Sequence, residues 1–274
     1  MSAANLELVG AAAGEAFDRL AATYDRSFTD SLIGRAQRNA VWKVLGATFQ
    51  SGDNVLELNC GTGEDAFFLS SQGVSVFCCD ASQHMIAHAK QRLEHHQASA
   101  SVVFFHLPTE RIGELHPIHH FDGAFSNFSG LNCVSDLESA ATDLSNLVKT
   151  GGTLVLCLST RFSLIEILYH CAQGQWKKGL RRCRGQAHAT LEGADLTIFY
   201  PTLRQIRRSF SPHFRIRSVR GIGVAIPPSY LESWACSHPL LFRLLCRLEP
   251  IFACLPLLRV TGDHMLLLFE RVSP

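Results

Sequence analysis

VLELNCGTGED, Val55 to Asp65, is a short apolar run that ends in a glycine-rich turn. An apolar run bounded by glycine is typical of a buried strand, and the residues after Gly63 favour a helix. Glycine permits positive φ and a close approach of the backbone to a ligand, and Asn59 tolerates the same left-handed geometry. The stretch therefore predicts a strand, a ligand-facing turn and a helix, although one glycine-rich loop is weak evidence by itself.

Strands and helices are predicted to alternate as far as residue 160. The strands are expected at 54–59, 74–80, 101–107, 121–128 and 153–160, and the helices at 14–47 (with a break near 30–34), 64–73, 82–96 and 136–152. Such alternation indicates right-handed crossovers and a parallel sheet covered on both faces. A ligand is then expected at the carboxyl ends of the strands.

The pattern changes after residue 160. A helical stretch (162–185), a hairpin (187–200), a short helix (202–210), a strand (214–226), a mostly helical insertion (227–261) and a last strand (264–272) are expected there.

Asp80 ends the second predicted strand. An acid at this place can accept hydrogen bonds from ribose hydroxyls, either of a dinucleotide or of an adenosyl cofactor. Two features favour the adenosyl cofactor. Ala66 stands at the third glycine of the pattern G-x-G-x-x-G, and Glu64 and Asp65 open the helix at which a pyrophosphate would lie and would repel it.

Residues 55–93, VLELNCGTGEDAFFLSSQGVSVFCCDASQHMIAHAKQRL, resemble the first two motifs of class I S-adenosylmethionine-dependent methyltransferases. The family pattern is a strand, E/D-x-G-x-G-x-G, a helix, a strand ending in an acid, and then D-x-S-x-x-M-x-x-x-A. Ser82, Met85 and Ala89 follow this pattern, whereas Asn59 replaces its first glycine. The resemblance covers about residues 15–160 and the last strand.

The resemblance implies an α/β fold with S-adenosyl-L-methionine as cofactor. The sheet would be Rossmann-like and parallel with an antiparallel last strand, with helices on both faces and apolar helical insertions at the ligand edge. The implied cofactor-binding residues are Glu57, Asn59, Cys60, Gly61, Thr62 and Gly63 at the methionine end, Asp80 at the ribose, Ala81, Met85, Pro108 and Thr109 around adenine, and Asn127 and Phe128 beside the sulfonium. The turn at Pro108 lacks the acid that often contacts adenine.

Three residues are candidates for catalysis. His264 and Asp263 begin the last strand, whose start lies at the ligand edge if that strand is antiparallel; a turn-stabilising role for Asp263 is the alternative. Tyr200 is a third candidate. A base is needed only if the acceptor arrives protonated. No metal site is expected, because no acid or cysteine completes a set with the clustered histidines.

The 274 residues are expected to form a single methyltransferase domain, 1–274, with an N-terminal helical cap at 14–47 and substrate-lid insertions at 161–200 and 227–262. The apolar second insertion indicates a small-molecule acceptor with hydrophobic character or a packed subunit; the oligomeric state stays open. With a formal net charge of +1, no nucleic-acid partner is expected. The basic stretch Lys177–Arg184 is typical of a solvated helix end or of a peripheral contact with an anionic membrane.

No transmembrane segment and no secretory signal are expected, and the scattered cysteines favour a cytoplasmic protein. Two alternatives to a methyltransferase stay open. One is an NAD(P)-dependent oxidoreductase, against which Ala66 and the acidic helix start argue. The other is a non-catalytic protein that binds an adenosyl cofactor, which the departures at Asn59 and Leu107 would favour.

Overall fold

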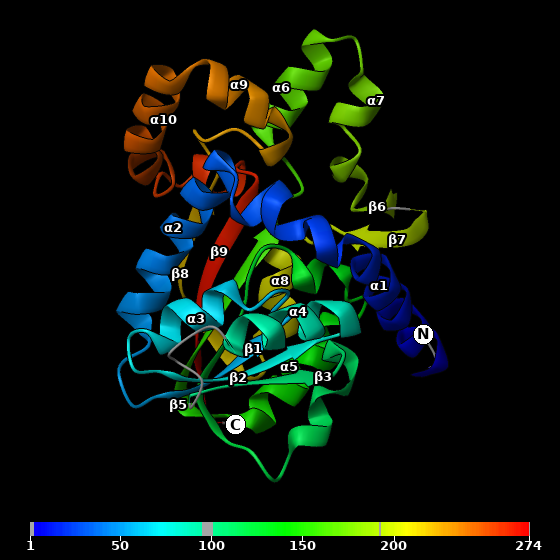
Figure 1. Cartoon of the computed structure of the whole chain (residues 1–274), viewed down its shortest axis with the longest axis vertical. Helices are drawn as coiled ribbons and strands as arrows, with labels where there is room; N and C mark the ends of the chain where they lie inside the picture. The colour runs from blue at the N-terminus through cyan, green and yellow to red at the C-terminus, as the bar shows by residue number, and fades with distance from the viewer. Residues whose placement is uncertain (1–2, 95–100, 192, 274) are drawn as a thin grey trace.

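A computed structural model describes residues 3–94, 101–191 and 193–273 (Figure 1). The central sheet has seven strands in the order β3-β2-β1-β4-β5-β9-β8, and β6 and β7 form a separate hairpin. The strands are β1 (Asn54–Leu58), β2 (Ser75–Asp80), β3 (Val102–His106), β4 (Phe121–Ser126), β5 (Val148–Ser159), β6 (Gln186–Leu191), β7 (Ala194–Phe199), β8 (Phe214–Ile222) and β9 (His264–Arg271).

The helices surround this sheet. They are α1 (Ala3–Tyr24), α2 (Leu32–Thr48), α3 (Glu64–Ser70), α4 (Gln83–Glu94), α5 (Leu137–Leu147), α6 (Leu164–Ala172), α7 (Trp176–Gly179), α8 (Leu203–Phe210), α9 (Glu232–Ser237) and α10 (Pro239–Phe252). Shorter helical turns are η1 (Asp25–Thr29), η2 (Thr109–Leu115), η3 (Gly130–Cys133), η4 (Arg182–Arg184), η5 (Ser229–Leu231) and η6 (Leu258–Val260).

Strands β1 to β5 are parallel, and β9 runs antiparallel to both β5 and β8. The expected Rossmann-like sheet with an antiparallel last strand is therefore confirmed. Alternate side chains of each strand point to opposite faces. Leu56 accordingly joins a core shared with α5 and α8, whereas Val55 joins the core beneath α2, α3 and α4.

Local signals set several helix starts. The Ser82 hydroxyl accepts from the N–H of Met85 at 3.0 Å, which is the N-cap expected from the sequence. Thr202 and Gln205 form a reciprocal capping box at the start of α8. Helix α2 is completed from a distance, because the Glu232 carboxylate of α9 accepts from the N–H groups of Leu32 (2.6 Å) and Ile33 (3.0 Å).

Several boundaries differ from the prediction, and the helix expected from residue 14 already begins at Ala3. The helix expected at 136–152 ends at Leu147, because Val148 already pairs with Phe121 in the sheet. Pairing with β4 thus overrides the glycine signal at 151–152. The single helix expected at 162–185 is three pieces, α6, α7 and η4, interrupted at Gly174 with φ of 72°.

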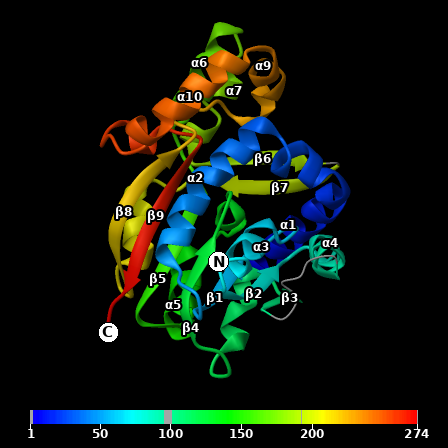
Figure 2. The ribbon, with the colours of Figure 1, turned by 60° about the vertical axis from the view of Figure 1, so that its left-hand side comes forward.

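The insertions after β5 and β8 lie at one end of the molecule. Helices α6, α7, α9 and α10 gather beyond the carboxyl ends of the parallel strands in two views (Figures 1 and 2). Among the described residues, no helix is long and apolar enough to span a bilayer.

Candidate active site

The turn after β1 is left-handed at three places. Asn59 has φ of 55°, Gly61 of 53° and Gly63 of 80°. The two glycines serve different purposes. A Cβ on Gly63 would lie 2.6 Å from the Phe104 ring, so this glycine permits packing, whereas a Cβ on Gly61 would meet nothing within 4 Å. The backbone of Gly61 therefore faces open space, as a ligand-binding turn requires.

Asn59 does more than adopt the turn geometry. Its Oδ1 accepts from the Ser126 hydroxyl at 3.0 Å, and its Nδ2 donates to Thr109 Oγ1 at 3.1 Å. A Cβ on Gly130 would lie 2.2 Å from the Asn59 side chain. The residue that replaces the family's first glycine thus connects the ends of β1 and β4 with η2, and Gly130 leaves room for it.

Asp80 lies beside this turn. Its Oδ2 accepts from Gly61 N and its Oδ1 from Ser82 N, both at 2.8 Å. Burial raises the pKa of Asp80, and the two N–H groups offset that rise in part. Each carboxylate oxygen has a further lone pair, so the carboxylate can still accept from two ligand hydroxyls.

The turn and Asp80 border a small pocket that α1 covers. Its cavity has a volume of about 70 Å³. Gly14 of α1 packs against the Ala81 carbonyl, from which an added Cβ would lie 2.5 Å away. Asp18 of α1 accepts from the Ser82 hydroxyl (2.6 Å) and from His84 N (2.8 Å). The volume holds about two waters, so a nucleoside would enter only if α1 moved outward.

The structure places seven of the predicted cofactor residues around this pocket. They are Asn59, Gly61, Asp80, Ala81, Met85, Asn127 and Phe128. Six predicted residues lie outside its lining, namely Glu57, Cys60, Thr62, Gly63, Pro108 and Thr109. Residues of α1 and η3 complete the lining, namely Ala13, Gly14, Phe17, Tyr24, Gly130 and Cys133. Sequence reasoning missed them, because small and aromatic residues on an amphipathic helix carry no chemical signature.

Glu57 lies beneath the turn rather than in the pocket. It is 1% exposed, and its carboxyl accepts from the Cys78 thiol at 3.5 Å. Burial raises the pKa of Glu57 well above its usual value, and nearby Asp65 raises it further. This carboxyl is therefore a neutral core group that packs under the turn.

The acids that open α3 are paired with arginines. Glu64 accepts from Arg92 and Arg35, and Asp65 contacts Arg38 at 2.7 Å. The expected repulsion of a pyrophosphate by Glu64 and Asp65 is therefore wrong, because the arginines largely balance the charges of both carboxylates. Their structural effect is to fasten α2 and α4 to the start of α3.

A second polar cluster lies behind Phe128. The His264 ring meets the Phe128 ring edge-on at 5.5 Å between centroids, and His264 Nδ1 lies 3.6 Å from Asp263 Oδ2. Arg182 Nη2 contacts Asp263 Oδ1 at 2.9 Å and Glu166 Oε2 at 2.6 Å. His264 thus lies behind Phe128, which forms the wall of the pocket, and a buried ion pair with Arg182 fixes the adjacent Asp263.

Opposing effects act on the pKa values of His264 and Asp263. Burial lowers the pKa of His264, and Asp263 offsets that decrease in part. Burial raises the pKa of Asp263, but His264 and Arg182 outweigh it, so the net pKa is lowered. A neutral imidazole beside a carboxylate results, which is an arrangement that can accept a proton near neutral pH.

Tyr200 is not among the residues that line the pocket. It is buried, and the Arg182 guanidinium lies over its ring at 5.5 Å. Burial raises the pKa of Tyr200. Its place beneath Arg182 suits packing rather than contact with a reacting atom. Arg182 itself had been grouped with a solvated basic helix end, yet it is buried.

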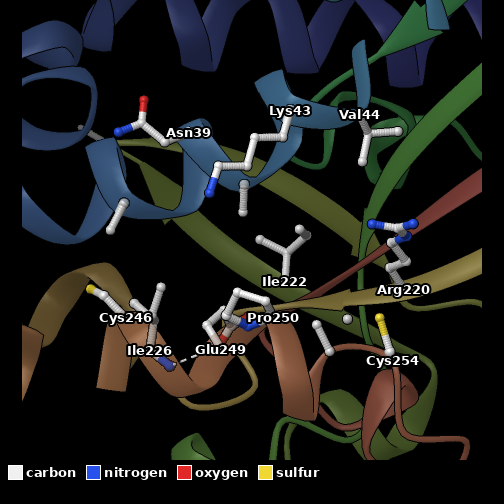
Figure 3. Close-up of a pocket in the computed structure, with 14 residues that line it drawn as sticks. Asn39, Lys43, Val44, Arg220, Ile222, Ile226, Cys246, Glu249, Pro250 and Cys254 are labelled. Carbon is white, nitrogen blue, oxygen red and sulfur yellow. Dashed lines mark hydrogen bonds between the residues drawn. The ribbon is translucent and has the colours of Figure 1, made fainter. Parts of the chain in front are cut away.

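A larger cavity, of about 350 Å³, lies between α2, β8 and α10 (Figure 3). Its walls are mainly apolar, with Lys43 and Arg220 among the lining residues. Glu249 is its one acid, and this carboxylate already accepts from the N–H groups of Val224, Ala225 and Ile226 at 2.7–3.1 Å. Glu249 therefore keeps a lone pair on one oxygen only, whereas Asp80 keeps one on each oxygen for the two hydroxyls of a ribose, so the smaller pocket is the better cofactor site.

Comparison with known proteins identifies a methyltransferase domain within this chain. The sequence pattern of the family described as "Methyltransferase domain" matches residues 55–152, from β1 into β5. Residues 55–152 therefore carry a methyltransferase domain. A demethylmenaquinone methyltransferase of Tropheryma whipplei is 31% identical over 146 residues, which are 52% of this chain and 56% of that enzyme. An uncharacterised protein of Methanocaldococcus jannaschii is 24% identical over 67% of each chain.

Solved structures share the fold of this methyltransferase domain. A putative S-adenosylmethionine-dependent methyltransferase of Listeria monocytogenes aligns over 85% of this chain and 96% of its own, with a TM-score of 0.57 and 15% identity. The [4+2]-cyclase SpnF aligns over 86% of this chain and 82% of its own, with the same TM-score and 15% identity. The fold alone therefore does not determine which reaction the domain performs.

The cofactor of this methyltransferase domain is S-adenosyl-L-methionine, and the residues present suit it. Gly61 has an open face at the turn, and Asp80 keeps acceptor capacity for ribose hydroxyls. The chain spans only about half of the length of the quinone methyltransferases that it resembles, and the match to the methyltransferase-domain family, at residues 55–152, contains these residues.

Proposed function

We propose that this protein transfers the methyl group of S-adenosylmethionine to a small lipophilic acceptor. The observation that carries the proposal is the pocket at the carboxyl ends of β1, β2 and β4. There the open face of Gly61, the Asp80 carboxylate and the Phe128 ring converge. Bound S-adenosylmethionine supplies a methyl group on a cationic sulfur.

The chain's own residues would orient the reactants. Asp80 would hold the ribose, and the aromatic rings of Tyr24 and Phe128 line the remainder of the pocket. Aromatic faces stabilise cations, so a sulfonium would be favoured beside them. Alignment of acceptor and methyl group would supply much of the rate enhancement. Because His264 lies behind Phe128, it would take a proton from an acceptor that arrives protonated once that ring had moved aside, and Asp263 would stabilise the resulting charge.

The lipophilic acceptor is proposed from two observations. Relatives are named as methyltransferases of demethylmenaquinone and of 2-phytyl-1,4-naphthoquinone, the latter at 30% identity over 142 residues. The insertions at 161–200 and 227–262 expose many apolar side chains at the ligand edge. We propose that they form the lid of the acceptor site, and that α1 and α2 form a cap over the cofactor.

Calorimetry with S-adenosylmethionine, S-adenosylhomocysteine and NADH tests the cofactor. We expect binding of both adenosyl compounds and none of NADH; the reverse would support an oxidoreductase. Transfer of a labelled methyl group to a panel of prenylated naphthoquinones, phenols and amines then tests the reaction. Binding without transfer to any acceptor of the panel would contradict the proposed activity and favour a non-catalytic binding protein.

A further inference from the structure

Helix α6 has its polar residues inside and its leucines outside. Glu166 is 0% exposed and His170 3%, whereas Leu164 is 44% and Leu168 60% exposed. Each pair is spaced four residues apart, so each marks one face of the helix, and the two faces are opposite. A surface helix normally presents its polar face to water. The arrangement of α6 is the reverse.

Helix α10 also has an apolar outer face. Phe242 and Glu249 are buried, whereas Leu240, Leu244 and Ile251 are 79%, 49% and 60% exposed. The exposed residues are spaced four and seven apart and form one stripe on the face opposite the buried residues. Pairing within the chain does not account for this stripe, because the helix already has a separate buried face.

These two helices belong to an apolar end of the molecule, which we define as residues 162–185 and 228–258. Of the sixteen large hydrophobic residues that are exposed in the described chain, twelve lie in this apolar end. They are Phe162, Leu164, Leu168, Trp176, Leu180, Tyr230, Leu240, Leu241, Leu244, Ile251, Leu255 and Leu257. Helices α6, α7, α9 and α10 meet there in both views (Figures 1 and 2).

The accessible charge of the apolar end is positive. Five exposed cations form no ion pair with any residue that the structure describes, namely Lys177, Lys178, Arg184, Arg243 and Arg247. The three acids of these segments are all engaged internally. Glu166 pairs with Arg182, Glu232 caps α2, and Glu249 accepts from three backbone N–H groups. The formal net charge of the whole chain is only +1, so this concentration of cations is local.

We propose that the apolar end docks on the surface of an anionic lipid bilayer. Helices that lie in the headgroup region of a bilayer combine exposed leucine and tryptophan with lysine and arginine. The apolar end has this composition and no accessible acid. Anionic lipid attracts each nearby cation, and apolar side chains add burial energy. A second copy of the chain fits less well, because a two-fold contact would bring the same unpaired cations together.

The docking would place the carboxyl ends of the parallel strands toward the bilayer, since α6 follows β5 and α9 follows β8. This orientation would let a lipophilic acceptor pass from the bilayer toward Phe128. That last point rests on the proposed function, whereas the docking itself rests only on the surface.

Co-sedimentation with phosphatidylcholine vesicles, with and without phosphatidylglycerol, tests the docking with the full chain. We expect binding to the anionic vesicles that weakens as salt is raised. Leu240→Glu with Leu244→Glu, and separately Lys177→Glu with Lys178→Glu, should each lower the partition coefficient at least about tenfold. Ile118→Glu is the matched control, because Ile118 is 78% exposed and precedes β4 at the opposite edge of the sheet.

Three results would overturn the proposal. They are no binding of the unaltered chain to anionic vesicles, an equal loss of binding in the Ile118 control, and a dimer in solution that Leu240→Glu with Leu244→Glu dissociates. Thermal unfolding verifies that the variants fold. Calorimetry with S-adenosylhomocysteine keeps the two proposals separate, because a failure of docking leaves cofactor binding intact and vesicle binding needs no cofactor.

Discussion

Asp80→Asn should weaken the binding of S-adenosylhomocysteine roughly ten- to hundredfold. The carboxylate accepts from Gly61 N and Ser82 N at 2.8 Å and retains one lone pair on each oxygen for the ribose. Asparagine has one neutral oxygen, and its amide nitrogen would face a donor. Losing one hydrogen bond to a charged group costs about 1.5–3 kcal/mol, which corresponds to that range of affinity.

Isothermal calorimetry measures this effect, with Asp122→Asn as control. Asp122 also accepts from a backbone N–H, that of Asn54 at 2.9 Å, but it lies at the opposite end of the strands. A folded Asp80→Asn protein whose Kd stays within about twofold of the original would refute the ribose role, because even one lost hydrogen bond exceeds that change.

The same variant makes a prediction about pH. Burial raises the pKa of Asp80, and only the ionised carboxyl can accept at both oxygens. The affinity of the unaltered chain should therefore fall as the pH drops through that raised pKa. The affinity of Asp80→Asn should lack this fall at low pH. The Kd values of the unaltered chain and of Asp80→Asn should therefore approach each other as the pH drops.

Substitutions at four further positions test other parts of the structure. Asn59→Gly should lower the free energy of unfolding by about 1–2 kcal/mol, because two hydrogen bonds are lost. Asn59→Ala should lower it further, because alanine is strained at positive φ. Urea denaturation measures both changes. Glu57→Gln should remove a slope in the free energy of unfolding against pH. The folded chain keeps a proton on Glu57 that the unfolded chain releases above about pH 4.3, so Glu57 favours folding most below that pH. This contribution falls by about 1.4 kcal/mol per pH unit as the pH rises toward the pKa of Glu57 in the folded chain. Gly14→Ala should push α1 away from the Ala81 carbonyl and so speed amide exchange in α1 and strengthen cofactor binding, because the outward movement that a nucleoside requires has then already been made. If His264 is the base, the rate should rise with pH through its lowered pKa and level off near neutral pH, and His264→Gln should lose this limb.

These four predictions have distinct controls. An Asn59→Gly protein as stable as the original would show that the hydrogen bonds to Ser126 and Thr109 contribute nothing net. An unchanged pH slope in Glu57→Gln would mean that another group causes it. For Gly14→Ala, a fall in affinity would contradict the view that α1 must move outward to admit the cofactor. For His264, the exposed His188→Gln serves as reference, and a parallel loss in both variants would exclude a specific base.

The parts of the fold that were predictable are those with local causes. The turn at Asn59–Gly63, the Ser82 cap and the Asp80 strand end depend on residues close in sequence, and the structure has all three where they were expected. The predicted start of β5 was wrong, because the pairing of Val148 with Phe121 of β4 outweighs the local sequence signal that predicted a helix there.

The parts of the site that were missed depend on distant partners. The arginines that balance Glu64 and Asp65 lie on α2 and α4, and nothing in a helix start reveals them. Arg182 belongs to a basic run whose other members are mostly exposed, so its burial beside Asp263 had no signal in the sequence. The covering of the pocket by α1 likewise follows from packing at Gly14.

The remote cap of α2 has a consequence for the order in which the chain acquires its structure during synthesis. The first two N–H groups of α2 are bonded by Glu232, a residue that leaves the ribosome 200 positions after Leu32. Domains generally begin to fold as their amino-terminal part emerges. Leu32 and Ile33 therefore gain these partners only after β1 to β8 have been synthesised, shortly before β9, the strand that joins β8 to the rest of the sheet.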